Sequence, residues 1–256
     1  MGHETEYHDA MLDMLELIWG DGFMAPGGRG NVAKMVAGLD LAGRNVVDVG
    51  CGIGGPACLL ARELGARVVG IDLEAPLVER ARQRALSEGL SDRVRFEVVE
   101  VGPMPFADAS VDLVLSAGAY TQTADKLAAF RDCHRVLKPG GSIRLYDWTR
   151  RDGPLSDEMR RWIELEGLSY ALETQDRYRE ILTEAGFVDI EVEDASAWYR
   201  KKAAEEYEAI RGPLFPGTVE ALGREQAEHF AENWRAMVVV CQKGEMRQGY
   251  SRARKP

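Results

Sequence analysis

A glycine-rich turn between a short apolar segment and a helix constrains this chain more than any other feature. It lies in VVDVGCGIGG, residues 46–55. Gly50, Gly52 and Gly55 have the G-x-G-x-x-G spacing of a dinucleotide site. Gly50, Gly52 and Gly54 have the G-x-G-x-G spacing of another kind of nucleotide-binding turn. Because such a turn brings backbone N–H groups and a helix N-terminus close to a ligand, it predicts a bound nucleotide of one kind or the other.

Apolar segments alternate with helical segments on both sides of this turn. Strands separated by helices of this length form βαβ units, with right-handed crossovers, so the sequence predicts an α/β fold with helices on both faces of a mostly parallel sheet. The predicted strands of the core are residues 45–50, 66–73, 94–101, 111–118 and 142–148. The predicted helices between them are residues 55–65, 75–89 and 125–141, the last stopped by Pro139 and Gly140.

The length of 256 residues suits one domain with one sizeable core. We expect a helix and a covering loop in residues 1–40, because apolar residues recur at helical spacing before Gly20. Residues 41–150 form the predicted core. Residues 151–248 are expected to form a helical cap that includes a strand near 188–196, and residues 249–256 the final strand.

Charge and cysteine content exclude several classes of function. A net charge of −10 argues against nucleic-acid binding, which depends largely on Lys and Arg. The sequence has no apolar run of the ~18 residues that a membrane span needs, and no basic-then-apolar leader. Its four cysteines have no C-x-x-C or metal-ligand spacing. We therefore expect a cytoplasmic protein with reduced thiols and no metal site, acting on a small molecule.

Two acidic residues flank the glycine turn in the predicted fold. Asp48 lies two residues before the first glycine, where a carboxylate can hold the turn or meet the ammonium group of a ligand. Asp72 ends the second strand about twenty residues further on, where it can accept hydrogen bonds from both ribose hydroxyls. Sites for NAD share that acid, so Asp72 is compatible with either nucleotide.

The order of the motifs after Asp72 resembles that of the class I S-adenosylmethionine-dependent methyltransferases. Glu100 and Val101 end the predicted third strand, FADASVDLVLS leads into the fourth, and RVLKPGG precedes the fifth. The resemblance covers nearly the whole chain. It implies a Rossmann-like sheet of seven strands, with the last strand, in GYSRARKP, antiparallel to the rest.

The same resemblance implies a site for S-adenosyl-L-methionine and its product S-adenosyl-L-homocysteine. The implied cofactor residues are Met24, Asp48, Gly50, Cys51, Gly52, Gly54, Asp72, Leu73, Glu100, Val101 and Ser116. The glycines would line the methionine portion and Asp72 would hold the ribose. Leu73, Glu100 and Val101 would lie beside the adenine. Glu100 stands where an Asp is more usual, and a solvated acid at a strand end is the alternative interpretation.

The opening segment YHDAMLDMLELIWGDGFMAPGG resembles the phosphoethanolamine and the sarcosine/dimethylglycine N-methyltransferases. In that group a tyrosine thirteen residues before the glycine matched by Gly20 reaches the active site, and Tyr7 has this spacing. The loop from Met24 to Gly28 would cover the cofactor. Trp148 after the fifth strand and Tyr170 before ETQDRY are further matches, and we expect both to contact substrate.

Departures from that group concern the acceptor. Gln122 stands where the phosphoethanolamine enzymes have a histidine, and glutamine can orient a substrate but cannot act as a base. Leu168, also a candidate substrate contact, replaces an arginine that meets phosphate, and Val238 aligns with a lysine. Two phosphate-binding cations are thus replaced by apolar residues, so phosphoethanolamine is not the expected substrate.

We therefore predict S-adenosylmethionine-dependent methyl transfer to a small molecule, with an amine or amino-acid nitrogen as the first choice of acceptor. Tyr7 and Gln122 are the candidate catalytic residues; alternatively Tyr7 caps the helix and Gln122 is a solvated loop residue. The aromatic residues of the cap could enclose a methylammonium group or simply pack its core. Three alternatives stay open: O- or C-methylation of an apolar natural product, a repurposed methyltransferase fold, and an NAD-dependent oxidoreductase.

Overall fold

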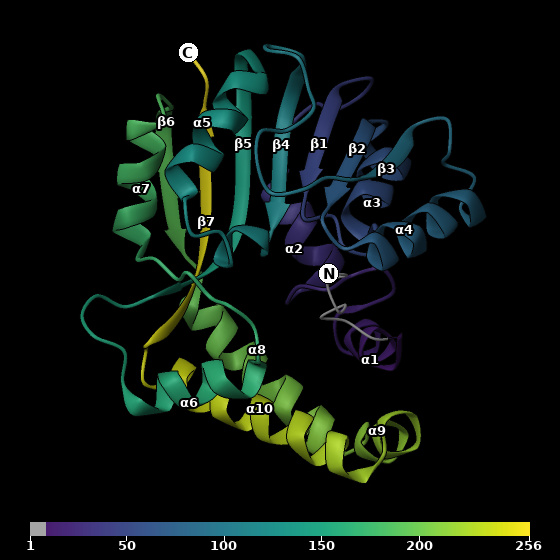
Figure 1. The fold of residues 1–256 in the computed structure, drawn as a ribbon, viewed down its shortest axis with the longest axis vertical. Helices are drawn as coiled ribbons and strands as arrows, with labels where there is room; N and C mark the ends of the chain where they lie inside the picture. Colours follow the sequence, from purple (N-terminus) through teal and green to yellow (C-terminus); the bar gives the residue numbers. More distant parts are fainter. Residues whose placement is uncertain (1–8) are drawn as a thin grey trace.

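A seven-stranded sheet forms the centre of the computed structural model, which describes residues 9–256 (Figure 1). The strand order is β3-β2-β1-β4-β5-β7-β6, and β7 runs antiparallel to its neighbours β5 and β6. The strands are β1 (Asn45–Val49), β2 (Arg67–Asp72), β3 (Val94–Val98), β4 (Val111–Ala117), β5 (Leu137–Arg150), β6 (Val188–Asp194) and β7 (Met246–Arg254). This order confirms the predicted α/β fold with an antiparallel final strand.

Helices cover both faces of the sheet because its strands are apolar on both sides. Val46 packs with α2, α3 and α4 in one cluster, and the next residue, Val47, packs with α5 and α7 in the other. The helices before the cap are α1 (Asp9–Trp19), α2 (Gly28–Met35), α3 (Gly55–Leu64), α4 (Ala75–Ser87) and α5 (Lys126–Val136), with the short 3₁₀ helix η1 (Ala119–Thr121) after β4.

The later helices form a separate layer beyond the sheet, seen below it in Figure 1. They are α6 (Asp157–Glu166), α8 (Ser196–Arg211), α9 (Phe215–Leu222) and α10 (Arg224–Gln242), whereas α7 (Gln175–Glu184) packs on the sheet. We call these four helices the cap. A third apolar cluster that includes Trp162, Tyr199 and Met237 fills it. None of the helices in residues 9–256 combines the length and the apolar character of a membrane span.

Three predicted boundaries were wrong. β3 ends at Val98, so Glu100 and Val101 follow the strand in an exposed turn before Gly102. The helix predicted for residues 125–141 ends at Val136, because the residues just before Pro139 turn to extended backbone and start β5. β7 begins at Met246 rather than near residue 249, because its whole length pairs with β5, from Arg150↔Met246 to Ser142↔Arg254.

Candidate active site

The glycine turn after β1 has a backbone that only glycine adopts easily. Gly50 and Gly52 have φ angles of +68° and +51°. The amides of Gly50 and Cys51 both donate to the Ile71 carbonyl, at 2.9 and 3.1 Å, which ties the turn to the end of β2. A Cβ atom on Gly50 would lie 2.2 Å from the Cβ of Ala119 in η1. The turn is therefore enclosed by backbone on one side and by η1 on the other.

Asp72, at the end of β2, faces this turn. Its Oδ2 accepts a hydrogen bond from the Gly52 amide at 2.9 Å, and its Oδ1 accepts one from the Glu74 amide at 3.0 Å. Partial burial raises the pKa of the Asp72 carboxyl, against these two hydrogen bonds. Each carboxylate oxygen has a second lone pair, so Asp72 can fix the turn and still accept hydrogen bonds from a ligand.

Asp48 and Ser116 lie deeper, on β1 and β4. Asp48 is 1% exposed, and burial together with the nearby charge of Asp72 raises the pKa of its carboxyl to about 7. The Ala57 amide in the first turn of α3 donates to this carboxyl, while its Oδ2 has no partner among residues 9–256. The hydroxyl of Ser116 is likewise buried without a partner in that range. Asp48 thus supports the start of α3 from below the turn.

The N-terminal segment closes over the turn. We call α1, α2 and the loop of residues 20–27 between them the lid. The Gly55 amide donates to the Gly22 carbonyl at 3.0 Å, so two backbones meet there without intervening side chains. Met24 reaches the turn itself, because its Sδ lies 2.7 Å from the point that a Cβ on Gly52 would occupy. Met24 is thus close to the predicted cofactor position.

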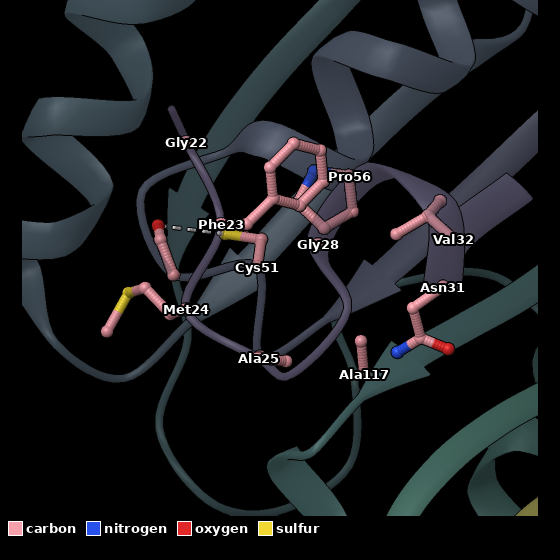
Figure 2. A pocket seen from close by; sticks show the side chains of 12 residues that line it. Gly22, Phe23, Met24, Ala25, Gly28, Asn31, Val32, Cys51, Pro56 and Ala117 are labelled. Carbon is pink, nitrogen blue, oxygen red and sulfur yellow. Dashed lines mark hydrogen bonds between the residues drawn. The ribbon is translucent and has the colours of Figure 1, made fainter. Parts of the chain in front are cut away.

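A small pocket lies between the lid and the turn (Figure 2). The lid contributes Met24, Ala25 and Asn31 to its lining, among others. The other side includes Gly50, Cys51 and Gly52 of the turn and Ala117 at the end of β4. The pocket therefore brings together four of the predicted cofactor residues, from segments that are far apart in the sequence.

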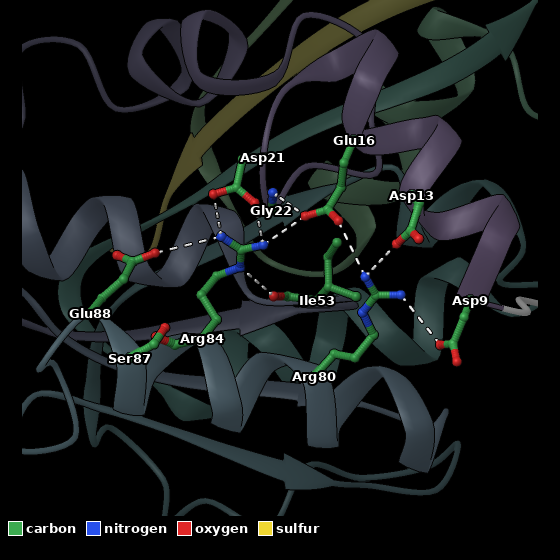
Figure 3. A network of polar contacts seen from close by, with 10 residues as sticks. All are labelled: Asp9, Asp13, Glu16, Asp21, Gly22, Ile53, Arg80, Arg84, Ser87 and Glu88. Atoms are coloured by element: carbon green, nitrogen blue, oxygen red, sulfur yellow. Dashed lines mark hydrogen bonds and ion pairs between the residues drawn. The ribbon is translucent and has the colours of Figure 1, made fainter. Parts of the chain in front are cut away.

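Ion pairs fasten the lid to α4, the helix that follows Asp72 (Figure 3). Arg84 donates to Asp21 at 2.8 Å and to Glu16 at 2.7 Å. The same Glu16 oxygen accepts a hydrogen bond from the Gly22 amide at 2.7 Å. Arg80, one turn earlier in α4, donates to Glu16 at 3.3 Å. One acidic side of α1 and its loop thus faces one basic side of α4, directly beside the turn.

The residues predicted to flank adenine lie on the other side of Asp72. Leu73 is 48% exposed and Val101 is 86% exposed, and Val98 at the end of β3 is 43% exposed. Glu100 is also exposed. Val98 ends β3 and pairs with Asp72 at the end of β2, and Leu73 directly follows Asp72, so exposed apolar side chains lie beside this carboxylate, with the acidic Glu100 two residues beyond Val98. Such a surface suits the face of a flat ring.

The candidate catalytic residues are only partly covered by the structure, since Tyr7 lies outside the described residues. Gln122 is exposed and directly follows η1, the short helix whose Ala119 lies over Gly50. The amides of Tyr120 and Thr121 donate to the buried carboxyl of Asp147 in β5, which holds η1 in place. Gln122 is therefore on a supported loop at the edge of the site.

The candidate substrate residues belong to the cap side. The ring of Trp148 lies 5.4 Å from that of Trp162 and 5.9 Å from that of Tyr170, and Tyr170 stacks on Trp162 at 5.1 Å. These faces contact one another, which is packing of the cap core. Leu168, two residues before Tyr170, is partly buried. Val238 of α10 is also partly buried and packs against the apolar cluster of the cap. None of these residues lines the pocket beneath the lid.

Two further aromatic residues lie closer to the lid: Trp198, one of the cap aromatics considered above, and Tyr146, which no motif indicated. Trp198 of α8 is 42% exposed, and its ring is 2.8 Å from the position of a Cβ on Gly27 of the lid. Its ring meets that of Tyr146 edge-on at 6.5 Å. Tyr146 pairs with Ala117 across β4 and β5, so it is next to the pocket. Tyr146 could have been selected because it precedes Trp148 by two residues and shares its side of the strand.

A buried carboxyl also connects the lid to the cap. Glu206 of α8 is 3% exposed and accepts hydrogen bonds from two indole N–H groups. Trp19, the last residue of α1, donates to Oε1 at 2.9 Å, and Trp234 of α10 donates to Oε2 at 3.3 Å. Burial raises the pKa of the Glu206 carboxyl to about 7. No sequence motif indicated this contact, because Trp19 is 187 residues from Glu206 in the chain.

Comparison with known proteins gives one family match. A family model described as "Methyltransferase domain" matches residues 46–141. Phosphoethanolamine N-methyltransferase 1 of Arabidopsis thaliana is 30% identical over 96% of this chain and 49% of its own length. The chain thus spans about half the length of this relative. The 27-O-demethylrifamycin SV methyltransferase of Amycolatopsis mediterranei is 32% identical over 80% of this chain and 81% of its own length.

Among solved structures, phosphoethanolamine N-methyltransferase 2 of Haemonchus contortus contains a region that is similar to nearly the whole of this chain. It was determined in complex with phosphomonomethylethanolamine and S-adenosylhomocysteine. The TM-score is 0.91 at 26% identity, and the match covers 98% of this chain and 58% of that one. The similarity therefore includes the lid and the cap as well as the sheet.

Proposed function

Because the chain belongs to the class I S-adenosylmethionine-dependent methyltransferases, we propose that it transfers the methyl group of S-adenosylmethionine to a small-molecule acceptor. The observation that carries this proposal is the pair formed by Asp72 and the glycine turn, covered by the lid. A carboxylate for the ribose, an apolar surface beside it and a tight backbone turn all fit the cofactor. An NAD-dependent oxidoreductase finds no support among these relatives.

The protein's contribution to such a transfer is mainly orientation. When bound, the cofactor supplies an activated methyl group on its sulfonium centre. The glycine turn and Asp72 would hold it, and the lid would exclude water. Holding two reactants in line can lower a barrier by roughly 7–11 kcal/mol, so no covalent help from the chain is required. Gln122 and Tyr7 would orient the acceptor. An ammonium acceptor must first lose a proton, which the Tyr7 hydroxyl would pass to solvent, so that the free lone pair forms the bond to carbon as the S–CH₃ bond breaks.

The acceptor in this proposal is the nitrogen of a small amine or amino acid. The name of the Arabidopsis thaliana relative describes N-methylation, and its similarity extends over nearly this whole chain. Aromatic faces attract methylammonium groups by about 0.5–2 kcal/mol. Trp198, which is 42% exposed beside Gly27 of the lid, offers such a face.

A second candidate acceptor is a hydroxyl group or carbon atom on an apolar natural product. Leu168 and Val238 stand where two cations would bind phosphate, so the cap is more apolar than an enzyme for a phosphorylated amine would need. The name of the Amycolatopsis relative describes methylation of 27-O-demethylrifamycin SV, and the two chains align over most of both lengths.

The test is release of S-adenosylhomocysteine from the purified chain, measured with a panel of acceptors. The panel holds phosphoethanolamine, glycine, sarcosine, dimethylglycine, phenols and glycosylated metabolites. Turnover with an amine or amino acid supports the first acceptor class, and turnover only with hydroxylated scaffolds supports the second. Tight cofactor binding with no turnover on any member would favour an acceptor outside the panel or a repurposed fold.

A further inference from the structure

Asn31 has a buried amide with an unused hydrogen-bonding atom. It lies in the first turn of α2 and is 4% exposed, yet its Oδ1 has no hydrogen-bond partner among residues 9–256. A buried polar atom without a partner destabilises a fold, so native structures rarely keep one without a reason. A ligand that supplies the missing partner is such a reason.

The surroundings of Asn31 indicate which ligand it would meet. Its side chain lines the pocket beneath the lid, as does Ala117 at the end of β4 (Figure 2). The same pocket is lined by Gly50 and Gly52 of the turn and by Met24. None of the described cap helices contributes a lining residue. The amide therefore faces the cofactor side of the site and not the aromatic cluster of the cap.

The pocket is also free of charged lining residues in the described part of the chain. An amide group both donates and accepts hydrogen bonds, so it can serve a carboxylate and an ammonium group at once. A charged side chain at this position would attract one of these groups and repel the other. A neutral pocket with one amide is thus suited to a zwitterion.

From this placement we propose that Asn31 binds the amino-acid end of the cofactor, and so distinguishes S-adenosylmethionine and S-adenosylhomocysteine from nucleosides that lack this end. The inference rests on the proposed function. It also gives the lid a direct contact with the ligand, because Asn31 belongs to the segment whose Gly22 carbonyl contacts α3 and whose Asp21 contacts α4. The lid is then held by the ligand as well as by the protein.

Isothermal titration calorimetry on the full chain tests this with two ligands. S-adenosylhomocysteine has the amino-acid end, and 5′-methylthioadenosine keeps the nucleoside and sulfur but lacks it. In Asn31→Leu we expect the affinity for S-adenosylhomocysteine to fall by about 10- to 100-fold, the usual effect of losing a hydrogen bond to a charged group. The affinity for 5′-methylthioadenosine should not change.

Asn45→Leu and Asn31→Ala serve as controls for a general effect of the substitution and for loss of folding. Asn45→Leu makes the same substitution at an exposed position at the start of β1, and both affinities should stay at the wild-type value. Asn31→Leu removes an unpaired buried atom, so without ligand it should melt at the wild-type temperature or higher. If leucine prevents folding, Asn31→Ala replaces it in the same titrations.

The outcomes separate the two proposals. Wild-type protein that fails to bind S-adenosylhomocysteine would overturn the proposed function and this inference with it. Normal wild-type binding with no loss in the variant would overturn the inference alone. An equal loss for both ligands would also overturn it, because it would mean that the lid as a whole is disturbed.

Discussion

The glycine turn and the cap are built in different ways. At the turn the contacts run through the backbone: the Gly50 and Cys51 amides bond to Ile71, and the Gly55 amide bonds to Gly22. In the cap they run through side chains, as in the stack of Tyr170 on Trp162. Backbone contacts fix residue type by geometry, whereas packed side chains can be exchanged for others of similar volume. The cofactor half is therefore constrained residue by residue and the cap only as a layer.

The largest effect that this comparison predicts is that of Gly50→Ala. The new methyl group would lie 2.2 Å from the Cβ of Ala119, on a residue whose φ is +68°. Left-handed backbone destabilises by about 1–2 kcal/mol and overpacking by about 1–3 kcal/mol, so we expect a loss of about 2–5 kcal/mol. Chemical denaturation measures it, and binding of S-adenosylhomocysteine should be lost in parallel.

The matched control is Gly140→Ala. Gly140 has a φ of +78°, but nothing lies within 4 Å of an added Cβ there. This variant should lose only the conformational part, about 1 kcal/mol, and should bind S-adenosylhomocysteine normally. Equal losses in the two variants would mean that the approach of η1 to the turn is unimportant.

A smaller effect is expected for Asp72→Ala. The substitution removes the acceptor for the Gly52 and Glu74 amides and for the ribose hydroxyls. The affinity for S-adenosylhomocysteine should fall by about 10- to 100-fold, or about 1.4–2.7 kcal/mol. Calorimetry measures it against Asp92→Ala, an exposed acid before β3. Unchanged affinity in Asp72→Ala would show that the ribose assignment is wrong.

The smallest effect concerns Glu206, where the two halves meet. Burial raises its pKa from 4.5 to about 7, so between these values the folded protein holds a proton that the unfolded chain has lost. The stability from this group is fully present below about pH 4.5 and is lost as the pH rises towards 7. In the wild type this group lowers the free energy of unfolding as the pH rises from 5 to 7.5. In Glu206→Gln that decrease should be smaller by about 1–3 kcal/mol.

Denaturation at several pH values measures this, with Glu205→Gln as the control. Glu205 is the exposed neighbour of Glu206 in α8, so its replacement should leave the pH dependence as it is. A Glu206→Gln variant with the wild-type pH dependence would mean that this carboxyl is already ionised in the folded protein.

The backbone-built half was also the half that the sequence could predict. The turn and the position of Asp72 follow from spacing along the chain, and the structure brings Asp72 to the Gly52 amide. The antiparallel last strand was implied by the resemblance to methyltransferases, and the sheet confirms it. The end of β3 at Val98 could not be predicted, because Val99 and Val101 continue the β-branched pattern and only pairing with β2 limits the strand.

The remaining features depend on contacts between distant segments. Asn31 is an ordinary polar residue in α2 until the fold places it in the lining of the pocket beneath the lid. Trp198 becomes important only because Gly27 leaves room for its ring. Side-chain contacts of this kind have no fixed spacing in the sequence, which is why the acceptor side was the harder part to predict.

The contact of Glu206 with both the lid and the cap has a consequence for how two bound ligands would affect each other's affinity. Trp19 ends the lid helix and Trp234 belongs to the cap, so the lid and the cap share one buried hydrogen-bonded junction. Thermodynamic linkage is reciprocal: whatever factor a bound acceptor adds to the affinity for cofactor, bound cofactor adds to the affinity for acceptor. With the cofactor beneath the lid and the acceptor beside the cap, as proposed above, such a junction would let each substrate change the affinity for the other.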